Sequence, residues 1–170
     1  MNTASPFNDR LLDRRNLLRL TGLGTVGLVL SACSTTSSKP EEEKGPGTVR
    51  VRVSAAGNVN PNEAGRASPI AVSVFVLSGI GAFQQADYFQ LAENATTALG
   101  ANLVGSDRVF LRPGETKEVT LSTAAEQSYL GVIAGFQNID QASWRATTQV
   151  GHDDTVNVSV ARSSISARKA

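Results

Sequence analysis

Strict alternation between valine and polar residues is the feature that most limits how this chain can fold. In residues 48–55, TVRVRVSA, a valine occupies every second position, and residues 155–160, TVNVSV, repeat the pattern. Because successive side chains of a strand point to opposite faces, each segment predicts a strand with one buried and one exposed face. Arg50 and Arg52 fall on the exposed face of the first strand, where a solvated role is favoured over binding of an acidic partner.

Further strands are predicted where β-branched and apolar residues cluster between turn signals. Residues 70–77, IAVSVFVL, form one such run, and residues 128–136, SYLGVIAGF, are nearly all apolar, as in a central strand buried on both faces. Residues 106–122 predict a hairpin in which Pro113 and Gly114 suit the central positions of a type II turn. One more strand is expected at residues 144–150.

Residues 81–100 lose the period of two and predict a helical insert. Phe83, Ala86 and Phe89 recur at helical spacing, so a helix is expected to begin here, followed by a second turn or loop. Phe83, Tyr88 and Phe89 are expected to pack this insert on a sheet rather than to stack on a ligand.

These elements predict an all-β fold, a sandwich of about seven to eight strands with a small helical insert. Turn signals recur about every ten residues after Ser106, which is typical of a sandwich. Hydrophobic residues make up 41% of the 170-residue chain, enough for one core. We expect a β-sandwich domain at residues 48–161 with the insert at 81–100, and a frayed tail at 162–170.

The N-terminus has the layout of an export signal. Four arginines precede an uncharged run from Leu20 to Ala32, which is too short to cross a membrane. Residues 30–33, LSAC, resemble the bacterial lipobox, whose cysteine carries diacylglyceryl and N-acyl groups; Cys33 is the only cysteine. We therefore expect a signal peptide at residues 1–32, and the lipidated Cys33 with a flexible linker at 33–47. In enteric-type sorting, Ser34 after the cysteine implies the outer membrane.

The export route stays open between two possibilities. Residues 13–20, DRRNLLRL, resemble the twin-arginine motif, and an ordinary arginine-rich leader fits equally well.

The composition argues against several function classes. The net charge is +1 and no cluster of basic residues stands out, so the sequence lacks the positive charge that nucleic-acid binding requires. One histidine and one cysteine are too few for the usual zinc clusters, and no cofactor is expected beyond the lipid on Cys33. No nucleophile elbow or phosphate loop occurs, and His152 in GHDD is expected in an exposed turn. We expect no catalytic or metal site and no enzyme activity.

One loop is long enough to attract a functional interpretation. Residues 57–69, GNVNPNEAGRASP, are rich in asparagine, glycine and proline and exceed the usual length of a hairpin loop. Loops of this length on a rigid scaffold are often binding sites.

Several segments together resemble the TssJ family of type VI secretion lipoproteins. They are GRASPIAVSVFVL, FQQADYFQL, VFLRPGETKEVTL and YLGVIAGFQNIDQASWRA, in this order after the lipobox. The resemblance runs over roughly residues 60–150. It implies a transthyretin-like sandwich, a location at the periplasmic face of the outer membrane, and binding to the periplasmic region of a TssM/IcmF-like inner-membrane subunit, in a complex that includes a TssL-type subunit.

The resemblance also implies which residues bind the partner. The family's partner-binding loop joins the first two strands, which here gives Asn58, Val59, Asn60, Pro61, Asn62, Glu63, Ala64, Gly65, Arg66, Ala67 and Ser68. Arg66 is a candidate anchor, with a purely structural turn at this point as the alternative. Asp140, Trp144 and Arg145 form another family signature, which we interpret as a buried tryptophan with Asp140 capping its turn, rather than as a contact surface.

Two other functions remain as alternatives. A periplasmic lipoprotein that binds a small ligand or a glycan would need a pocket lined by aromatic residues, which are only 5% of the chain. A hydrolase would need carboxylates that are distant in sequence to meet in space.

Overall fold

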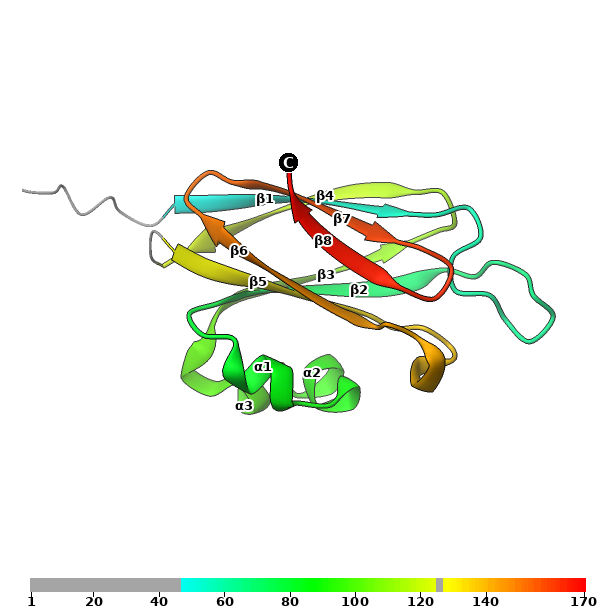
Figure 1. Ribbon diagram of the computed structural model, residues 1–170, viewed down its shortest axis with the longest axis horizontal. Coiled ribbons are helices and arrows are strands. Elements are labelled where there is room, and N and C mark those ends of the chain that lie inside the picture. The colour runs from blue at the N-terminus through cyan, green and yellow to red at the C-terminus, as the bar shows by residue number, and fades with distance from the viewer. Residues whose placement is uncertain (1–46, 125–126) are drawn as a thin grey trace, which may run out of the picture. The chain divides into compact units, whose positions relative to one another are not determined.

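Eight strands within the described part of the chain, residues 47–124 and 127–170 of the computed structural model, form two four-stranded sheets (Figure 1). In spatial order, the first sheet consists of β4 (Thr116–Thr123), β1 (Gly47–Ala55), β7 (Thr155–Val160) and β8 (Ile165–Lys169). The second consists of β3 (Leu103–Leu111), β2 (Ile70–Leu77), β5 (Gln127–Ala134) and β6 (Arg145–Gly151). The predicted all-β sandwich with a small helical insert is confirmed.

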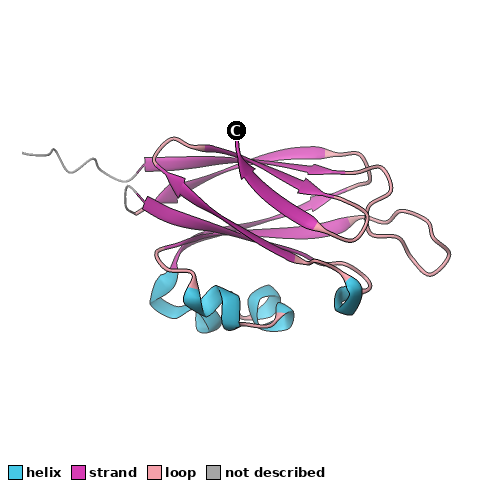
Figure 2. Ribbon diagram, in the orientation of Figure 1, coloured by secondary structure: helices cyan, strands magenta, loops and turns pink. Residues whose placement is uncertain are grey.

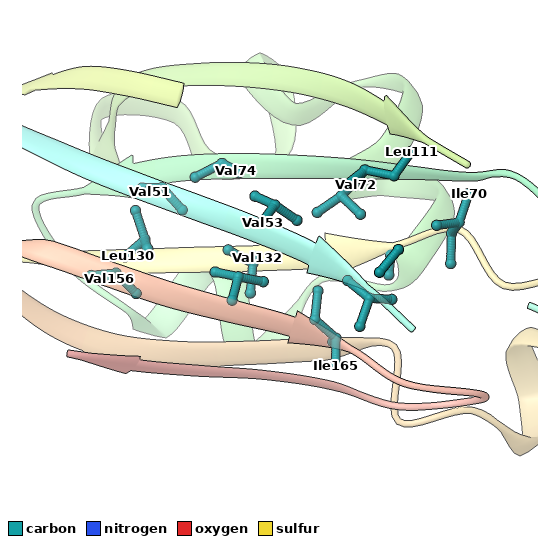
Figure 3. Packing of buried hydrophobic residues seen from close by; sticks show 14 of the residues in the cluster. Val51, Val53, Ile70, Val72, Val74, Leu111, Leu130, Val132, Val156 and Ile165 are labelled. Carbon is teal, nitrogen blue, oxygen red and sulfur yellow. The ribbon is translucent and has the colours of Figure 1, made fainter. Parts of the chain in front are cut away.

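The alternating valines of β1 and β7 lie side by side in the first sheet and face Val72, Val74 and Val132 of the second sheet (Figure 3). β1 pairs with β4 in antiparallel and with β7 in parallel orientation, so that Val51 lies between Val119 and Val156. Val51 is fully buried, and Val156 and Val158 are at most 1% exposed. The inward-facing valines predicted from the alternation therefore form the core.

The central strands β2 and β5 are buried on both faces. Their second face carries Phe75, Leu77 and Ile133, which a helical layer covers (Figure 2). This layer consists of α1 (Gly81–Gln85), α2 (Tyr88–Glu93), α3 (Ala95–Leu99) and the 3-10 turn η1 (Gly100–Asn102). Double coverage explains why these two strands read as continuous apolar runs.

The insert contains three short helices where the sequence predicts one helix followed by a turn. Asp87 separates α1 from α2. Its backbone is extended, and its side chain accepts a hydrogen bond from the backbone N–H of Gln90 in a capping box that starts α2. Gly100, with φ of 52°, ends α3 in a conformation that favours glycine.

Two arginines of the second sheet, Arg145 and Arg108, bind the helical layer. Nη1 of Arg145 donates to the carbonyl oxygens of Phe83, Gln84 and Ala86 at 3.4, 2.8 and 3.2 Å, and so pairs the free carbonyls at the end of α1. Arg108 donates to the hydroxyl of Ser73 at 2.9 Å and to the carbonyl of Ala92. The insert is therefore fixed by polar contacts as well as by its apolar face.

The expectation of a frayed tail at residues 162–170 is wrong. β8 pairs with β7 in antiparallel register, with Val160 opposite Ile165 and Val158 opposite Ala167. Ile165 is 6% exposed, and Lys169 forms an ion pair with Asp154 at 2.7 Å. The segment carries only one large apolar residue, Ile165, so its sequence does not predict a strand. It is ordered because its backbone pairs with the edge of β7, which would otherwise be unpaired. The sandwich domain therefore extends to residue 169 rather than ending at 161.

The signal peptide, Cys33 and most of the linker predicted at 33–47 lie outside the described residues. Within residues 47–124 and 127–170, none of the helices combines the length and the apolar character needed to span a membrane.

We predict that Gly131→Ala destabilises the domain through the helical insert. An added Cβ would lie 2.8 Å from Cε2 of the fully buried Phe83, so the ring and α1 must shift. Such overpacking lowers the free energy of unfolding by about 1–3 kcal/mol, measurable by urea denaturation. Gly105→Ala is the matched control in β3, since the nearest atom to its Cβ is the Ser122 carbonyl oxygen at 4.0 Å. Equal stabilities for the two variants would contradict the prediction.

Candidate functional site

The β1–β2 loop, residues 56–69, projects from one end of the sandwich (Figure 1). The predicted loop is confirmed as a loop; its partner-binding role stays a prediction. Its candidate residues divide by burial into three groups: Val59 and Asn60 are buried, Pro61, Asn62, Ala67 and Ser68 are half-buried, and Asn58, Glu63, Ala64, Gly65 and Arg66 are exposed. The loop therefore has a structural base and an exposed tip.

Asn60 ties the base of the loop to two neighbouring connections. Its side-chain amide donates to the Pro69 carbonyl at 2.9 Å, and its Oδ1 accepts from the backbone N–H of Gln137 at 2.8 Å. Its own N–H donates to the carbonyl of Arg162 at 3.0 Å. Asn60 is 3% exposed and has φ of 49°, a left-handed conformation that asparagine tolerates.

The tip of the loop is closed by backbone hydrogen bonds. The N–H of Asn62 donates to the Arg66 carbonyl at 2.9 Å, while Oδ1 of Asn62 accepts from the Arg66 N–H at 2.9 Å. Gly65 has φ of 76° and donates to the Asn62 carbonyl at 2.8 Å. Gly65 is thus a turn residue, and the turn leaves the Arg66 side chain exposed.

A cleft of about 580 Å³ lies beside the loop. Residues 60–63 form one wall, residues 136–141 of the β5–β6 connection form another, and Arg162 and Ser163 of the β7–β8 turn complete it. The sequence predicts the loop wall of this cleft but not the other two walls. Residues 136–140, FQNID, carry only a family signature in the sequence, and Arg162 lies in the tail that is expected to be frayed.

The signature residues lie at the junction of the helical insert and the sandwich. Trp144 is half-buried and contacts apolar residues on both faces of the second sheet, so it is not confined to the sandwich core. The Arg145 guanidinium lies 4.9 Å from the centre of its ring. Asp140 lies in η2 (Ile139–Gln141), whose N-terminus has no side-chain cap, so the expectation that Asp140 caps the turn is wrong.

Tyr88 joins this group from the helical layer. Its ring meets Trp144 edge to face at 5.6 Å and Phe89 at 5.4 Å. Burial raises the pKa of the Tyr88 hydroxyl, with Arg108 acting in the opposite direction.

Phe83 is fully buried between the insert and the sheet, as predicted, whereas Phe89 is 61% exposed and does not pack on the sheet.

The R-P-G-E segment is a turn rather than a site. The Glu115 N–H donates to the Arg112 carbonyl at 3.0 Å, and Gly114 has φ of 79°, as a type II turn requires. The Glu115 carboxylate accepts from the Arg112 N–H at 2.7 Å, and this bond lowers its pKa.

No metal-binding group of three or more His, Cys, Asp or Glu side chains occurs in residues 47–124 and 127–170.

His152 is half-buried rather than exposed as expected, because its ring packs on Gly47, where a Cβ would lie 2.4 Å from the ring. Its neighbour Asp154 accepts from Lys169, which lowers the pKa of the carboxyl group.

The family model described as type VI secretion lipoprotein (VasD, EvfM, TssJ) matches residues 47–163. This chain belongs to the TssJ family. The match covers strands β1 to β7, the β1–β2 loop and all three walls of the neighbouring cleft, and it confirms the family named from the sequence. A comparison with curated protein sequences gave no match.

Solved structures share the fold. TssJ1 from Pseudomonas aeruginosa, a type VI secretion lipoprotein, is 32% identical over 74% of this chain and 97% of its own, with a TM-score of 0.66. Lip from Serratia marcescens, described as a membrane-bound component of the type VI secretion system, is 28% identical over 74% and 96%, with a TM-score of 0.62.

A third match comes from a structure described as the TssM C-terminal domain from EAEC. The matching chain is 22% identical over 71% of this chain and 99% of that one, with a TM-score of 0.61, and at this identity it shows the fold alone.

We predict that Asn60→Ala loosens the base of the loop. The N–H of Gln137 and the carbonyl of Pro69 lose their partner, and alanine is strained at a positive φ, so the free energy of unfolding should fall by about 2–4 kcal/mol in urea denaturation. Asn60→Gly removes the backbone strain and isolates the amide hydrogen bonds. Asn58→Ala, at an exposed position, is the control. If Asn60→Gly were as stable as the wild type, the amide would not be what holds the loop.

Proposed function

We propose that this TssJ-family chain is a non-enzymatic docking lipoprotein of the type VI secretion membrane complex. Lipid groups on Cys33 anchor it to the periplasmic face of the outer membrane. Its β1–β2 loop binds the periplasmic region of the TssM/IcmF-like inner-membrane subunit, in a complex that includes a TssL-type subunit. One observation carries the proposal: in a chain of this family, the β1–β2 loop has a base held by the hydrogen bonds of Asn60 and an exposed tip closed by a hydrogen-bonded turn.

The placement of the loop suits a protein that links a membrane to a partner. The chain enters the domain at Gly47, the first residue of β1, and the loop follows Ala55 at the other end of the same strand. Nine residues of strand span roughly 30 Å. The lipidated N-terminus and the binding loop therefore attach to opposite ends of a rigid strand.

The tip is suited to protein recognition. Its backbone is held by the hydrogen bonds between Asn62, Gly65 and Arg66, so little conformational freedom is lost on binding. Arg66 presents a guanidinium group, which is enriched among residues that dominate binding energy.

A small-ligand site is the less favoured use of this end. The cleft beside the loop has the size of a ligand pocket, but Phe136 is the one aromatic residue in its lining and is itself 6% exposed. The lining is mainly polar, which suits a wet protein interface better than an apolar ligand.

We predict that Arg66→Ala weakens binding to the cognate TssM periplasmic region by about tenfold or more in calorimetry, since exposed arginine anchors contribute strongly to interfaces. The test uses the chain from residue 33 onward with Cys33→Ser, and keeps Asn60 and Asn62 so that the loop stays folded. Arg168→Ala, at another exposed arginine on β8, is the matched control. Unchanged affinity for both Arg66→Ala and a Glu63→Ser/Arg66→Ser double variant would remove the tip from the interface.

We predict that Cys33→Ser releases the protein from membranes. Without the thiol no diacylglyceryl group can be attached, and stable anchoring needs two or three acyl chains. Cell fractionation should move the variant from the outer-membrane fraction to the soluble periplasmic fraction, while circular dichroism shows an unchanged fold. A variant that stays in the membrane fraction would contradict lipid anchoring.

A further inference from the structure

A second cleft, of about 310 Å³, lies between the start of α2 and the η2 turn. Asp87, Tyr88 and Phe89 line it from the helical insert, and Ile139, Asp140 and Trp144 line it from the β5–β6 connection.

The aromatic side of the cleft is rigid and partly exposed. Tyr88 meets both Trp144 and Phe89 edge to face, with ring planes at 81° and 79°. Trp144 is covered by the Arg145 guanidinium, which is itself held by three carbonyl groups of the α1 region. Phe89 is nevertheless 61% exposed, and one other large apolar residue of the described chain, Phe110, is similarly exposed at 64%.

The charged side of the cleft is acidic. Asp87 uses one carboxylate oxygen to cap α2, and the Asp140 side chain forms no hydrogen bond or ion pair within the described residues. The lining contains two carboxylates and no lysine or arginine. Aromatic rings beside carboxylates form a site for an organic cation, because the ring faces and the carboxylates both attract positive charge.

The two clefts share a wall. Ile139 and Asp140 line both this cleft and the cleft beside the β1–β2 loop. A stable protein interface usually involves about 20–30 residues on each side, far more than the four exposed residues of the loop tip. A partner that binds the tip and extends along the first cleft therefore reaches η2 and the second cleft.

We propose that the cleft between α2 and η2 receives a lysine or arginine side chain of the same partner that binds the loop tip. The proposal rests on the proposed docking function and extends its surface across η2. The cation would lie between the Asp140 carboxylate and the exposed ring of Phe89, with Tyr88 and Trp144 forming the floor.

The test is calorimetric titration of the same chain, from residue 33 onward with Cys33→Ser, against the cognate TssM periplasmic region at two salt concentrations. Asp140→Asn and Phe89→Ala should each weaken binding by about tenfold, and Asp140→Lys should weaken it further through repulsion. Asp140→Asn should also lessen the dependence of affinity on salt, because one charge pair is lost.

Two matched controls separate the cleft from general surface effects. Phe110→Ala removes a similarly exposed phenylalanine, and Glu93→Gln removes an exposed carboxylate at the far end of α2. Both should bind like the wild type, and thermal denaturation should show all variants folded.

The outcomes separate this inference from the function on which it rests. Wild-type affinity and salt dependence for Asp140→Asn, Asp140→Lys and Phe89→Ala, with binding still lost in the Arg66 variants, would overturn the cation cleft alone. A wild-type domain that does not bind the partner would overturn the docking function and this inference with it.

Discussion

Burial of β2 and β5 on both faces is the constraint on which the rest of the molecule depends. One face closes the sandwich against β1 and β7, and the other carries Phe75 and Ile133, which would be exposed without a further layer. The chain supplies that layer between β2 and β3, and Arg145 fixes it to the second sheet by pairing the carbonyls at the end of α1. The position of the helices is therefore set by what the sheet must bury.

The same constraint shapes the functional end of the molecule. Because β5 is central and rigid, the connection that follows it leaves the sheet at a defined point, and Asn60 binds that connection to the β1–β2 loop through the N–H of Gln137. The loop tip can then be polar and exposed without being loose. The buried Asn60 side chain thus holds the surface loop in place by hydrogen bonds to segments that the core keeps rigid.

The helical insert also gives the η2 turn a second neighbour. Tyr88 and Phe89 reach it from one side and the loop from the other, so η2 lies between two clefts of different chemistry. One cleft is polar and the other combines aromatic rings with carboxylates. A family signature that reads as one segment in the sequence therefore contributes to two parts of one continuous surface.

The sequence by itself determined the class of the fold, the inward valines of β1 and β7, the type II turn at Gly114 and the family. The first three follow from local periodicity and turn chemistry, which act over a few residues, whereas the family follows from the resemblance of several quoted segments. Tertiary structure decided the rest. Ile165–Lys169 is ordered only because β7 offers it an edge, Trp144 lies at a junction rather than in the core, and Asp140 faces a cleft instead of capping a turn. Each of these depends on pairing or packing between segments far apart in the chain, which local patterns do not encode.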